Sequence, residues 1–305
     1  MSLVNTEIPY ISDFEFKEDL FDNQKIVISS ATGTGKSTLL QNWDNDGYLG
    51  EHIVYVSNRL TLTDNICAKL GYTNYRDVKG EIFLEKTNKV AIQLESVHRI
   101  KDLHLVNTII FDEIVNLMSH AQQDHAGNLL KLMDFPATRI FLDASITKAD
   151  IKFIGRASGE MYVINNTFKP YKTKTFEVYE DAPNELYISQ ILADLAAGMN
   201  VYCTFGSKKK ADQLVLTVQG SGMCKPHEIV YYHGDNTKAD YLETGEIVQH
   251  AQKKKEDMSN LENVWDKARI VIVTPTICCG VDYNKVRFDR YYAVSQNGKQ
   301  TSTPD

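Results

Sequence analysis

One short stretch of this sequence is compatible with few folds: Ser30-Ala31-Thr32-Gly33-Thr34-Gly35-Lys36-Ser37. It follows the apolar run 25–29, which predicts a buried strand, and it precedes residues 38–43, which predict the start of a helix. Glycine has no Cβ atom, so backbone N–H groups in such a loop can turn toward an oxyanion, and the helix N-terminus adds partial positive charge. A strand, a glycine-rich turn and a helix in this order predict a phosphate-binding loop.

The stretch matches the pattern G-x-x-x-x-G-K-[ST], except that Ser30 takes the position of the first glycine. In such a loop Lys36 pairs with the β- and γ-phosphates and the hydroxyl of Ser37 binds Mg²⁺, so we expect ATP and Mg²⁺ as cofactors. The alternative is a chance glycine-rich turn, which the flanking strand and helix disfavour. The expected nucleotide-binding residues of this region are Ser30, Ala31, Thr32, Gly33, Thr34, Gly35, Lys36, Ser37 and Thr38.

The composition of the 305 residues is that of a globular protein, with 43% hydrophobic and 24% charged residues. A formal charge of −7 argues against coating nucleic acid by bulk electrostatics, so any such contact must be local. The five cysteines form no C-x-x-C pair, which favours free thiols in a reducing compartment. The sequence has no signal-like N-terminus and no apolar span of bilayer length, so we expect no membrane contact and a cytoplasmic location, or the compartment of its DNA or RNA.

Short β-branched runs alternate with helix-period segments along the chain, which predicts an α/β fold with mostly parallel sheets. A polar and basic stretch near 165–179 predicts a domain boundary, and we place one domain at 1–168 and a second at 169–305. After the first strand, the expected strands of the first domain are 53–56, 89–92, 108–111 and 139–142. Those of the second domain are 175–179, 200–204, 228–232, 269–274 and 290–294, with helices at 184–197 and 208–218.

The strand expected at 108–111 leads directly into two adjacent carboxylates, Asp112 and Glu113. This arrangement would bring Asp112 to the metal and would place Glu113 where it can polarise a water for in-line attack on the γ-phosphate. The alternative is a surface pair at a strand end, which is disfavoured downstream of a phosphate loop. Lys36, Asp112 and Glu113 are therefore the candidate catalytic residues, and Ser37 and Asp112 are the candidate metal ligands.

The second half of the chain has an apolar run at 269–273 that is followed by Thr274 and, further on, by Gly280-Val281-Asp282. Together with the motifs above, this order resembles the superfamily 2 helicases, in which two RecA-like domains hold ATP between them and move along one nucleic-acid strand. In that resemblance 30–37 is motif I, 112–115 is motif II, 143–145 is motif III and 274–282 is motif V. It implies that Gly280 and Asp282 face the nucleotide, and that Asp143 and Ser145 couple the ATP site to the nucleic acid.

A closer resemblance is to the viral replication origin-binding proteins of the herpesvirus type and their phage and large-virus relatives. It rests on the segments 57–62 (SNRLTL), 93–99 (QLESVHR), 231–235 and 274–277, which occur in the family's order over almost the whole chain. The resemblance implies single-stranded DNA as partner, with RNA as an alternative, and other replication proteins. Arg59 and Arg99 could equally be solvated surface charges. The nucleic-acid contacts that the resemblance implies are Ser57, Arg59, Gln93, Ser96, Gly234 and Thr274.

One motif of the family is missing from the sequence, the Q-x-x-G-R-x-x-R helix that supplies arginine fingers. Residues 295–300 contain glutamine and glycine but no arginine. We therefore expect an incomplete second RecA-like domain, and a chain that binds ATP but hydrolyses it weakly, because an arginine finger contributes about 10³–10⁵ in rate.

These motifs favour an ATP-dependent helicase or translocase core of the origin-binding type. One alternative is an ATP-gated DNA-binding module without motor activity, which the missing arginine motif favours and the intact carboxylate pair disfavours. Another is a terminase-type packaging ATPase, which shares motifs I and II but whose second half should hold a nuclease with clustered carboxylates. A small-molecule kinase is disfavoured, because no cluster of lid arginines follows the first domain.

Overall fold

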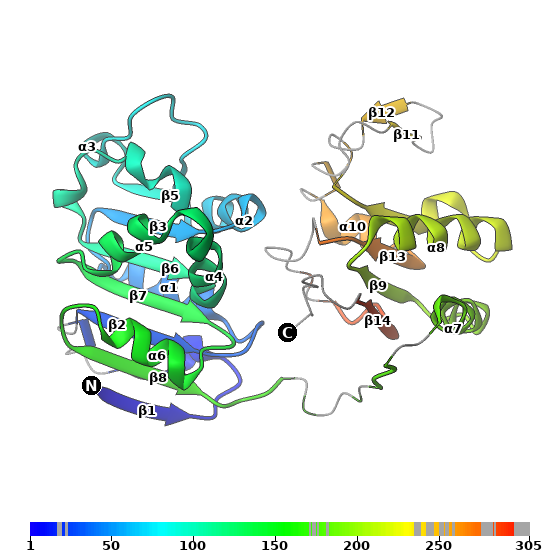
Figure 1. Cartoon of the computed structure of the whole chain (residues 1–305), viewed down its shortest axis with the longest axis horizontal. Coiled ribbons are helices and arrows are strands. Elements are labelled where there is room, and N and C mark those ends of the chain that lie inside the picture. Colours follow the sequence, from blue (N-terminus) through cyan, green and yellow to red (C-terminus); the bar gives the residue numbers. More distant parts are fainter. Residues whose placement is uncertain are drawn as a thin grey trace. The chain divides into compact units, whose positions relative to one another are not determined.

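The structure is a computed structural model of the chain. It describes residues 1–16, 20–21, 24–170, 172, 175, 177–180, 183–234, 239–241, 247–249, 253, 256–257, 260–275, 283 and 285–295. The contacts divide the chain into two compact units, Met1–Thr175 and Phe176–Pro304, which are described separately below (Figure 1). The domain boundary that we expect after residue 168 stays a prediction.

The described residues of the first unit form an eight-stranded parallel sheet, which confirms the predicted fold class (Figure 1). Its strand order is β1-β8-β2-β7-β6-β3-β5-β4. All four strands expected after the phosphate loop are present. The strands, in sheet order, are Ser2–Thr6, Met161–Asn166, Lys25–Ser29, Thr138–Asp143, Thr108–Asp112, Ile53–Ser57, Lys89–Gln93 and Thr73–Asn74.

Helices cover both faces of this sheet, because successive strand residues point to opposite faces and both faces are apolar. Ile26, Ile28 and Ile110 pack with α1 and α2 on one face, whereas Val27 and Phe111 pack with the other helices on the opposite face. The helices are α1 Lys36–Asn45, α2 Leu60–Leu70, α3 Leu84–Thr87, α4 Ile114–Asp124, α5 Ala126–Met133 and α6 Lys148–Gly155, with short 3₁₀ turns η1 Ile11–Asp13, η3 Leu94–Arg99 and η4 Leu103–Leu105.

The described residues of the second unit form a four-stranded parallel sheet in the order β10-β13-β9-β14 and a separate antiparallel pair, β11 with β12. The two expected helices and four of the five expected strands are present. The elements are α7 Asn184–Ala196, β9 Val201–Phe205, α8 Lys208–Ser221, η5 Pro226–Glu228, β10 Ile229–Tyr232, β11 Ala239–Tyr241, β12 Ile247–Gln249, α10 Leu261–Trp265, β13 Ile270–Val273 and β14 Arg290–Val294.

The strand expected at 175–179 is wrong for the residues that are described there, because none of them belongs to a strand. Val178 is 84% exposed and Tyr179 is 65% exposed. Residues of high β-propensity form a strand only where they can pack on a sheet, and these two side chains do not pack on one. Within the described ranges, no helix is both long and apolar enough to cross a bilayer.

Candidate nucleotide-binding site and adjoining surface

The candidate site lies where parallel strands of the first sheet end. The neighbouring strands β2, β7 and β6 lead into the phosphate loop, Asp143 and Asp112, respectively. The next two strands, β3 and β5, end at Ser57 and Gln93 on the same edge of the sheet. Parallel α/β sheets bind ligands at the carboxyl ends of their strands, so the fold gathers the predicted nucleotide and nucleic-acid residues of this unit along one edge.

The phosphate loop has the backbone geometry that its glycines predict, with φ of 78° at Gly33 and 85° at Gly35. An added Cβ at Gly35 would lie 3.0 Å from the hydroxyl oxygen of Ser12, so a side chain there would meet both backbone strain and a close neighbour. The backbone N–H of Ile11 also donates to the carbonyl of Thr34 at 2.7 Å. The segment before β2 therefore packs against the loop.

Ser30, at the position of the usual first glycine, contributes its hydroxyl to the hydrogen bonds of the loop. The Thr34 hydroxyl donates to the carbonyl of Ala31 at 2.6 Å, so the proton of the 2.6 Å contact between Ser30 Oγ and Thr34 Oγ1 comes from Ser30. Asn166 Nδ2, at the end of β8, donates to Ser30 Oγ at 3.0 Å. A buried Ser30 side chain thus links the loop to the neighbouring strand, which glycine could not do.

The ammonium group of Lys36 lies over the loop. Its Nζ donates to the carbonyl oxygens of Ser30 at 2.6 Å and Ala31 at 3.1 Å. These are neutral acceptors, and a phosphate oxygen offers the same donor a stronger, charge-assisted hydrogen bond. The loop therefore holds the Lys36 ammonium group where the oxygens of a triphosphate could replace the two carbonyl oxygens as acceptors.

Asp112 is a buried carboxylate, and each of its two oxygens accepts a hydrogen bond. The hydroxyl of Tyr55 donates to Oδ2, and the backbone N–H of Glu113 donates to Oδ1 at 3.0 Å. The pKa of Asp112 is raised to about 6, mainly because the carboxylate is buried and also because Glu113 is near, while the Tyr55 hydroxyl and Lys36 lower it. A divalent cation would offset the cost of burying this charge.

The residues present fit a magnesium ion that arrives with its nucleotide. Mg²⁺ is usually held by one or two protein oxygens together with substrate phosphates and waters, and Ser37 and Asp112 supply such oxygens. Across the described residues, no group of three or more histidine, cysteine, aspartate or glutamate side chains could hold a metal by itself. Because Ser37 and Asp112 would supply only part of the octahedral set of oxygens that Mg²⁺ takes, we predict that metal binding here depends on the nucleotide phosphates.

The Asp112→Asn variant should become more stable relative to the wild type as the pH rises. A carboxylate whose pKa is about 6 when folded and about 4 when unfolded favours folding below pH 4, and this contribution is lost as the pH rises through 6. The stability difference should grow by about 1 to 2 kcal/mol between pH 5 and pH 8.

Urea unfolding of the nucleotide-free protein at both pH values measures this difference. Glu160→Gln, at an exposed carboxylate, is the control. A difference between Asp112→Asn and wild type that stays constant or shrinks with rising pH would contradict the buried, ionised state of Asp112.

Glu113 and Asp143 connect the end of the sheet to the segments that follow it. Glu113 has a φ of 50°, and its Oε2 accepts a hydrogen bond of 3.1 Å from the side-chain amide of Asn116. The Asp143 carboxylate accepts from the Val115 N–H at 2.9 Å and from both the N–H and the hydroxyl of Ser145 at 2.9 Å. The Asp143 carbonyl accepts from the Ser30 N–H at 3.0 Å. Asp143 therefore bonds to the phosphate loop, the start of α4 and the segment after β7.

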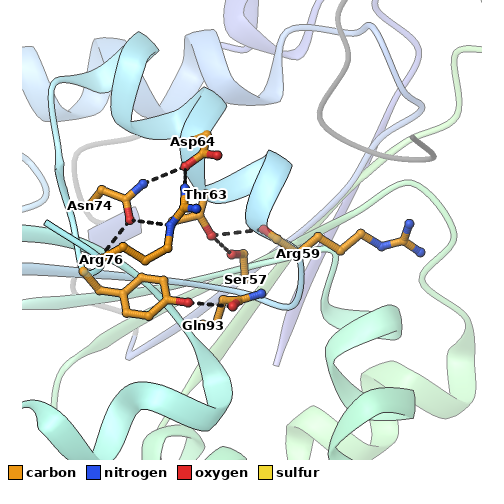
Figure 2. Close-up of polar contacts among 8 residues, drawn as sticks. Ser57, Arg59, Thr63, Asp64, Asn74, Arg76 and Gln93 are labelled. Carbon is orange, nitrogen blue, oxygen red and sulfur yellow. Dashed lines mark hydrogen bonds and ion pairs between the residues drawn. The ribbon is translucent and has the colours of Figure 1, made fainter. Parts of the chain in front are cut away.

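Two of the predicted nucleic-acid residues, Ser57 and Gln93, are buried and already hydrogen-bonded (Figure 2). Ser57 Oγ lies 2.7 Å from Thr63 Oγ1, whose proton goes to the carbonyl of Arg59 at 3.0 Å. Gln93 Oε1 accepts from the hydroxyl of Tyr75 at 2.6 Å. The Arg59 side chain extends away from this group of residues (Figure 2).

Neighbouring polar contacts hold these segments together. Asn74 Nδ2 donates to Asp64 Oδ1 at 2.7 Å, and the guanidinium of Arg76 also contacts Asp64, so α2 is tied to β4 (Figure 2). Arg99 donates to the carbonyl oxygens of Gly80 at 2.7 Å and Tyr75 at 3.0 Å. Arg99 thus has a structural role in fixing the 75–80 loop, whereas Ser96 is half-buried on η3.

Only part of the predicted site in the second unit is described. The Thr274 N–H, just after β13, donates to the carbonyl of Tyr232 in β10 at 3.0 Å, and the Thr274 side chain is buried. Gly234, after β10, is exposed. Gly280 and Asp282 lie outside the described residues, as does the 296–305 segment.

Sequence reasoning missed three contributors to the site: Tyr55, Asn166 and the segment around Ile11. Tyr55 carried a signal, since it is the single hydroxyl-bearing residue between aliphatic neighbours in the strand 53–56. The sequence contains no signal for Asn166 or Ile11, because their roles depend on contacts with residues distant in sequence, Ser30 for Asn166 and Thr34 for Ile11.

The parallel sheets and the phosphate loop define a P-loop protein with a RecA-like fold. Among solved structures, the DEAD-box helicase Mss116 bound to single-stranded RNA and UDP-BeF has a TM-score of 0.60 at 10% identity, covering 96% of this chain and 77% of its own. Dbp5 of S. cerevisiae bound to RNA and ADP BeF3 has a TM-score of 0.55 at 13% identity, covering 90% of this chain and 80% of its own. At these identities the similarity shows the fold alone.

The chain belongs to the origin of replication binding protein family, whose family model matches residues 14–174. Acanthamoeba polyphaga mimivirus has a "Putative replication origin-binding protein" that is 29% identical over 303 residues, covering 90% of this chain and 34% of that protein. A "Putative helicase/primase complex protein" of African swine fever virus is 24% identical over 292 residues, covering 89% of this chain and 26% of that protein. The chain thus spans about a quarter to a third of the length of these relatives.

Proposed function

We propose that this chain is the ATP-driven motor core of a viral-type replication protein, and that it couples ATP hydrolysis to movement along single-stranded DNA. The observation that carries the proposal is the set of hydrogen bonds made by Asp143. This one residue bonds to the phosphate loop through its carbonyl and to the start of α4 and Ser145 through its carboxylate. These contacts support the proposal that a change at the nucleotide is passed on to α4 and to the segment after β7.

In the proposed reaction, Lys36 binds the β- and γ-phosphates and Ser37 and Asp112 hold Mg²⁺. Mg²⁺ neutralises charge on the phosphate oxygens when it is bound. Glu113, whose carboxylate is bonded to the side-chain amide of Asn116, would accept a proton from water as the water oxygen bonds to the γ-phosphorus. The bond from the γ-phosphorus to the bridging oxygen then breaks, and that oxygen leaves with ADP. Gly280 and Asp282, which lie outside the described residues, are proposed as further nucleotide-binding residues.

The residues of the proposed nucleic-acid surface fall into two groups, those proposed to contact the strand directly and those that are buried. Arg59, whose side chain extends from the end of β3, is proposed to bind a backbone phosphate, and Ser96, Gly234 and Thr274 are proposed to lie along the same strand. The buried residues Ser57 and Gln93 are proposed to act indirectly, because Ser57 bonds to Thr63 in the first turn of α2 and Gln93 bonds to Tyr75. RNA is the alternative partner, because phosphate contacts do not distinguish the two nucleic acids.

If Arg59 neutralises one phosphate, the Arg59→Ala variant should bind single-stranded DNA several-fold more weakly. The slope of log affinity against log salt concentration should also become smaller in magnitude by about one. Fluorescence anisotropy of a labelled oligonucleotide, titrated at several salt concentrations, measures both quantities. Arg156→Ala is the matched control, since Arg156 is exposed at the C-terminal end of α6, which packs on the opposite face of the sheet from α2. Equal binding by both variants and the wild type would contradict the assignment of Arg59.

Translocation itself is tested by displacement of streptavidin from a biotinylated single strand in the presence of ATP. The motor proposal predicts displacement that requires ATP hydrolysis. DNA affinity that changes with bound nucleotide but no displacement would show an ATP-gated DNA-binding module and contradict the motor.

A further inference from the structure

The contact between Tyr55 and Asp112 is a feature of the site that no sequence motif explains. In the sheet, β3 pairs with β6 so that Tyr55 lies opposite Ile110, two residues before Asp112. Residues two apart in a strand point to the same face, so Tyr55 and Asp112 share the face that α1 and α2 cover. The tyrosine side chain is long enough to reach along this face, and its hydroxyl donates to Asp112 Oδ2.

This donor is held rigidly. Tyr55 has 0% exposure, every residue of β3 is buried, and the ring of Tyr72 packs edge-on against the Tyr55 ring with centroids 6.5 Å apart. The other oxygen of Asp112 accepts from the Glu113 N–H at 3.0 Å. The two donors, one on each oxygen, together favour one orientation of the carboxylate plane.

A carboxylate has about four lone-pair sites, and these two hydrogen bonds use two of them. We propose that Tyr55 is a positioning residue for the nucleotide-bound magnesium ion: it fixes the Asp112 carboxylate so that the remaining lone pairs are directed to the metal. This inference rests on the proposed function, since it assigns a partner to the residue that holds Mg²⁺. A hydrogen bond to a metal-binding carboxylate typically changes metal affinity 10- to 100-fold.

The competing interpretation is that the Tyr55 hydroxyl only satisfies a buried carboxylate. The two interpretations differ in what removal of the hydroxyl changes. A purely structural hydroxyl contributes to the free energy of unfolding and leaves the effect of Mg²⁺ on nucleotide affinity intact. Removal of a positioning hydroxyl reduces the effect of Mg²⁺ on nucleotide affinity and leaves the affinity without Mg²⁺ unchanged.

The test compares Tyr55→Phe with Tyr72→Phe, which removes a buried tyrosine hydroxyl from the same core. Binding of a fluorescent ATP analogue is titrated in EDTA and in Mg²⁺, and the ratio of the two affinities gives the gain due to the metal. We expect Tyr55→Phe to bind the analogue with wild-type affinity in EDTA. Its ratio of affinity in Mg²⁺ to affinity in EDTA should be about tenfold smaller than that of the wild type. Tyr72→Phe should keep the full gain.

A double-mutant cycle with Asp112→Asn makes the test specific. If Tyr55 acts through Asp112, Tyr55→Phe should cost nothing further in the Asp112→Asn background. A full Mg²⁺ gain in Tyr55→Phe, or an equal loss in Tyr72→Phe, would overturn the inference and leave the proposed function standing, provided that Asp112→Asn loses the gain. A wild-type chain whose nucleotide affinity ignores Mg²⁺ would overturn both.

Discussion

The Lys36→Ala variant is expected to lose nucleotide binding, with an affinity for Mg·ATP at least about 100-fold weaker than that of the wild type. Lys36 is the cation that the phosphate loop holds over the carbonyls of Ser30 and Ala31, at 2.6 and 3.1 Å. Charge-assisted hydrogen bonds to phosphate contribute about 1.5–3 kcal/mol each, and the ammonium group would make two of them. Isothermal titration calorimetry with a slowly hydrolysed ATP analogue gives the affinity directly.

Lys152→Ala is the matched control for this variant. Lys152 is an exposed lysine in the last turn of α6, so its removal changes the net charge equally and leaves the loop untouched. Binding should be unchanged in the control. Unaltered ATP affinity in Lys36→Ala would mean that the loop does not bind the triphosphate.

The second large effect is expected for Glu113→Gln, which should bind ATP normally and hydrolyse it about 100- to 10,000-fold more slowly. A general base contributes 10²–10⁴ in rate, and glutamine keeps the shape of glutamate and its ability to accept from Asn116. Single-turnover hydrolysis of radiolabelled ATP, with protein in excess, detects the chemical step even when turnover is slow.

The control for Glu113→Gln is Glu85→Gln, at an exposed glutamate in the short helix α3. It should hydrolyse ATP at the wild-type rate. Equal single-turnover rates for Glu113→Gln and the wild type would remove Glu113 from the chemistry and would leave Asp112 as the remaining carboxylate of the pair.

Much of the fold was predictable because its signals are local. The loop at 30–37 identifies itself by residue type, and the strands at 53–57 and 108–112 are continuous buried runs whose polar ends mark the carboxyl edge of the sheet. The order of motifs along the chain then identified the family, which the match to residues 14–174 confirms.

What the sequence did not predict depends on distant pairing. The strand at 2–6 is an exposed edge strand that pairs with 161–166, and neither run is long or apolar enough to be recognised without its partner. The same holds for Asn166, which lies 136 residues from Ser30 in sequence.

Burial also separates residues that the sequence treats alike. Ser57 and Arg59 belong to one motif, yet Ser57 has 0% exposure, whereas Arg59 is half-buried and its side chain extends away from Ser57 (Figure 2). Residue type indicates which groups can bind a phosphate. The packing of α2 on β3 decides which of them can reach one.

We propose that the loop at 30–37 and the carboxylate of Asp112 bind one triphosphate with its magnesium ion. A crystal structure of the chain with Mg²⁺ and a non-hydrolysable ATP analogue is the decisive experiment. We predict that the Lys36 ammonium leaves the carbonyls of Ser30 and Ala31 for the phosphates, with the metal between Ser37 and Asp112. A nucleotide bound elsewhere, with Lys36 still on those carbonyls, would contradict the claim.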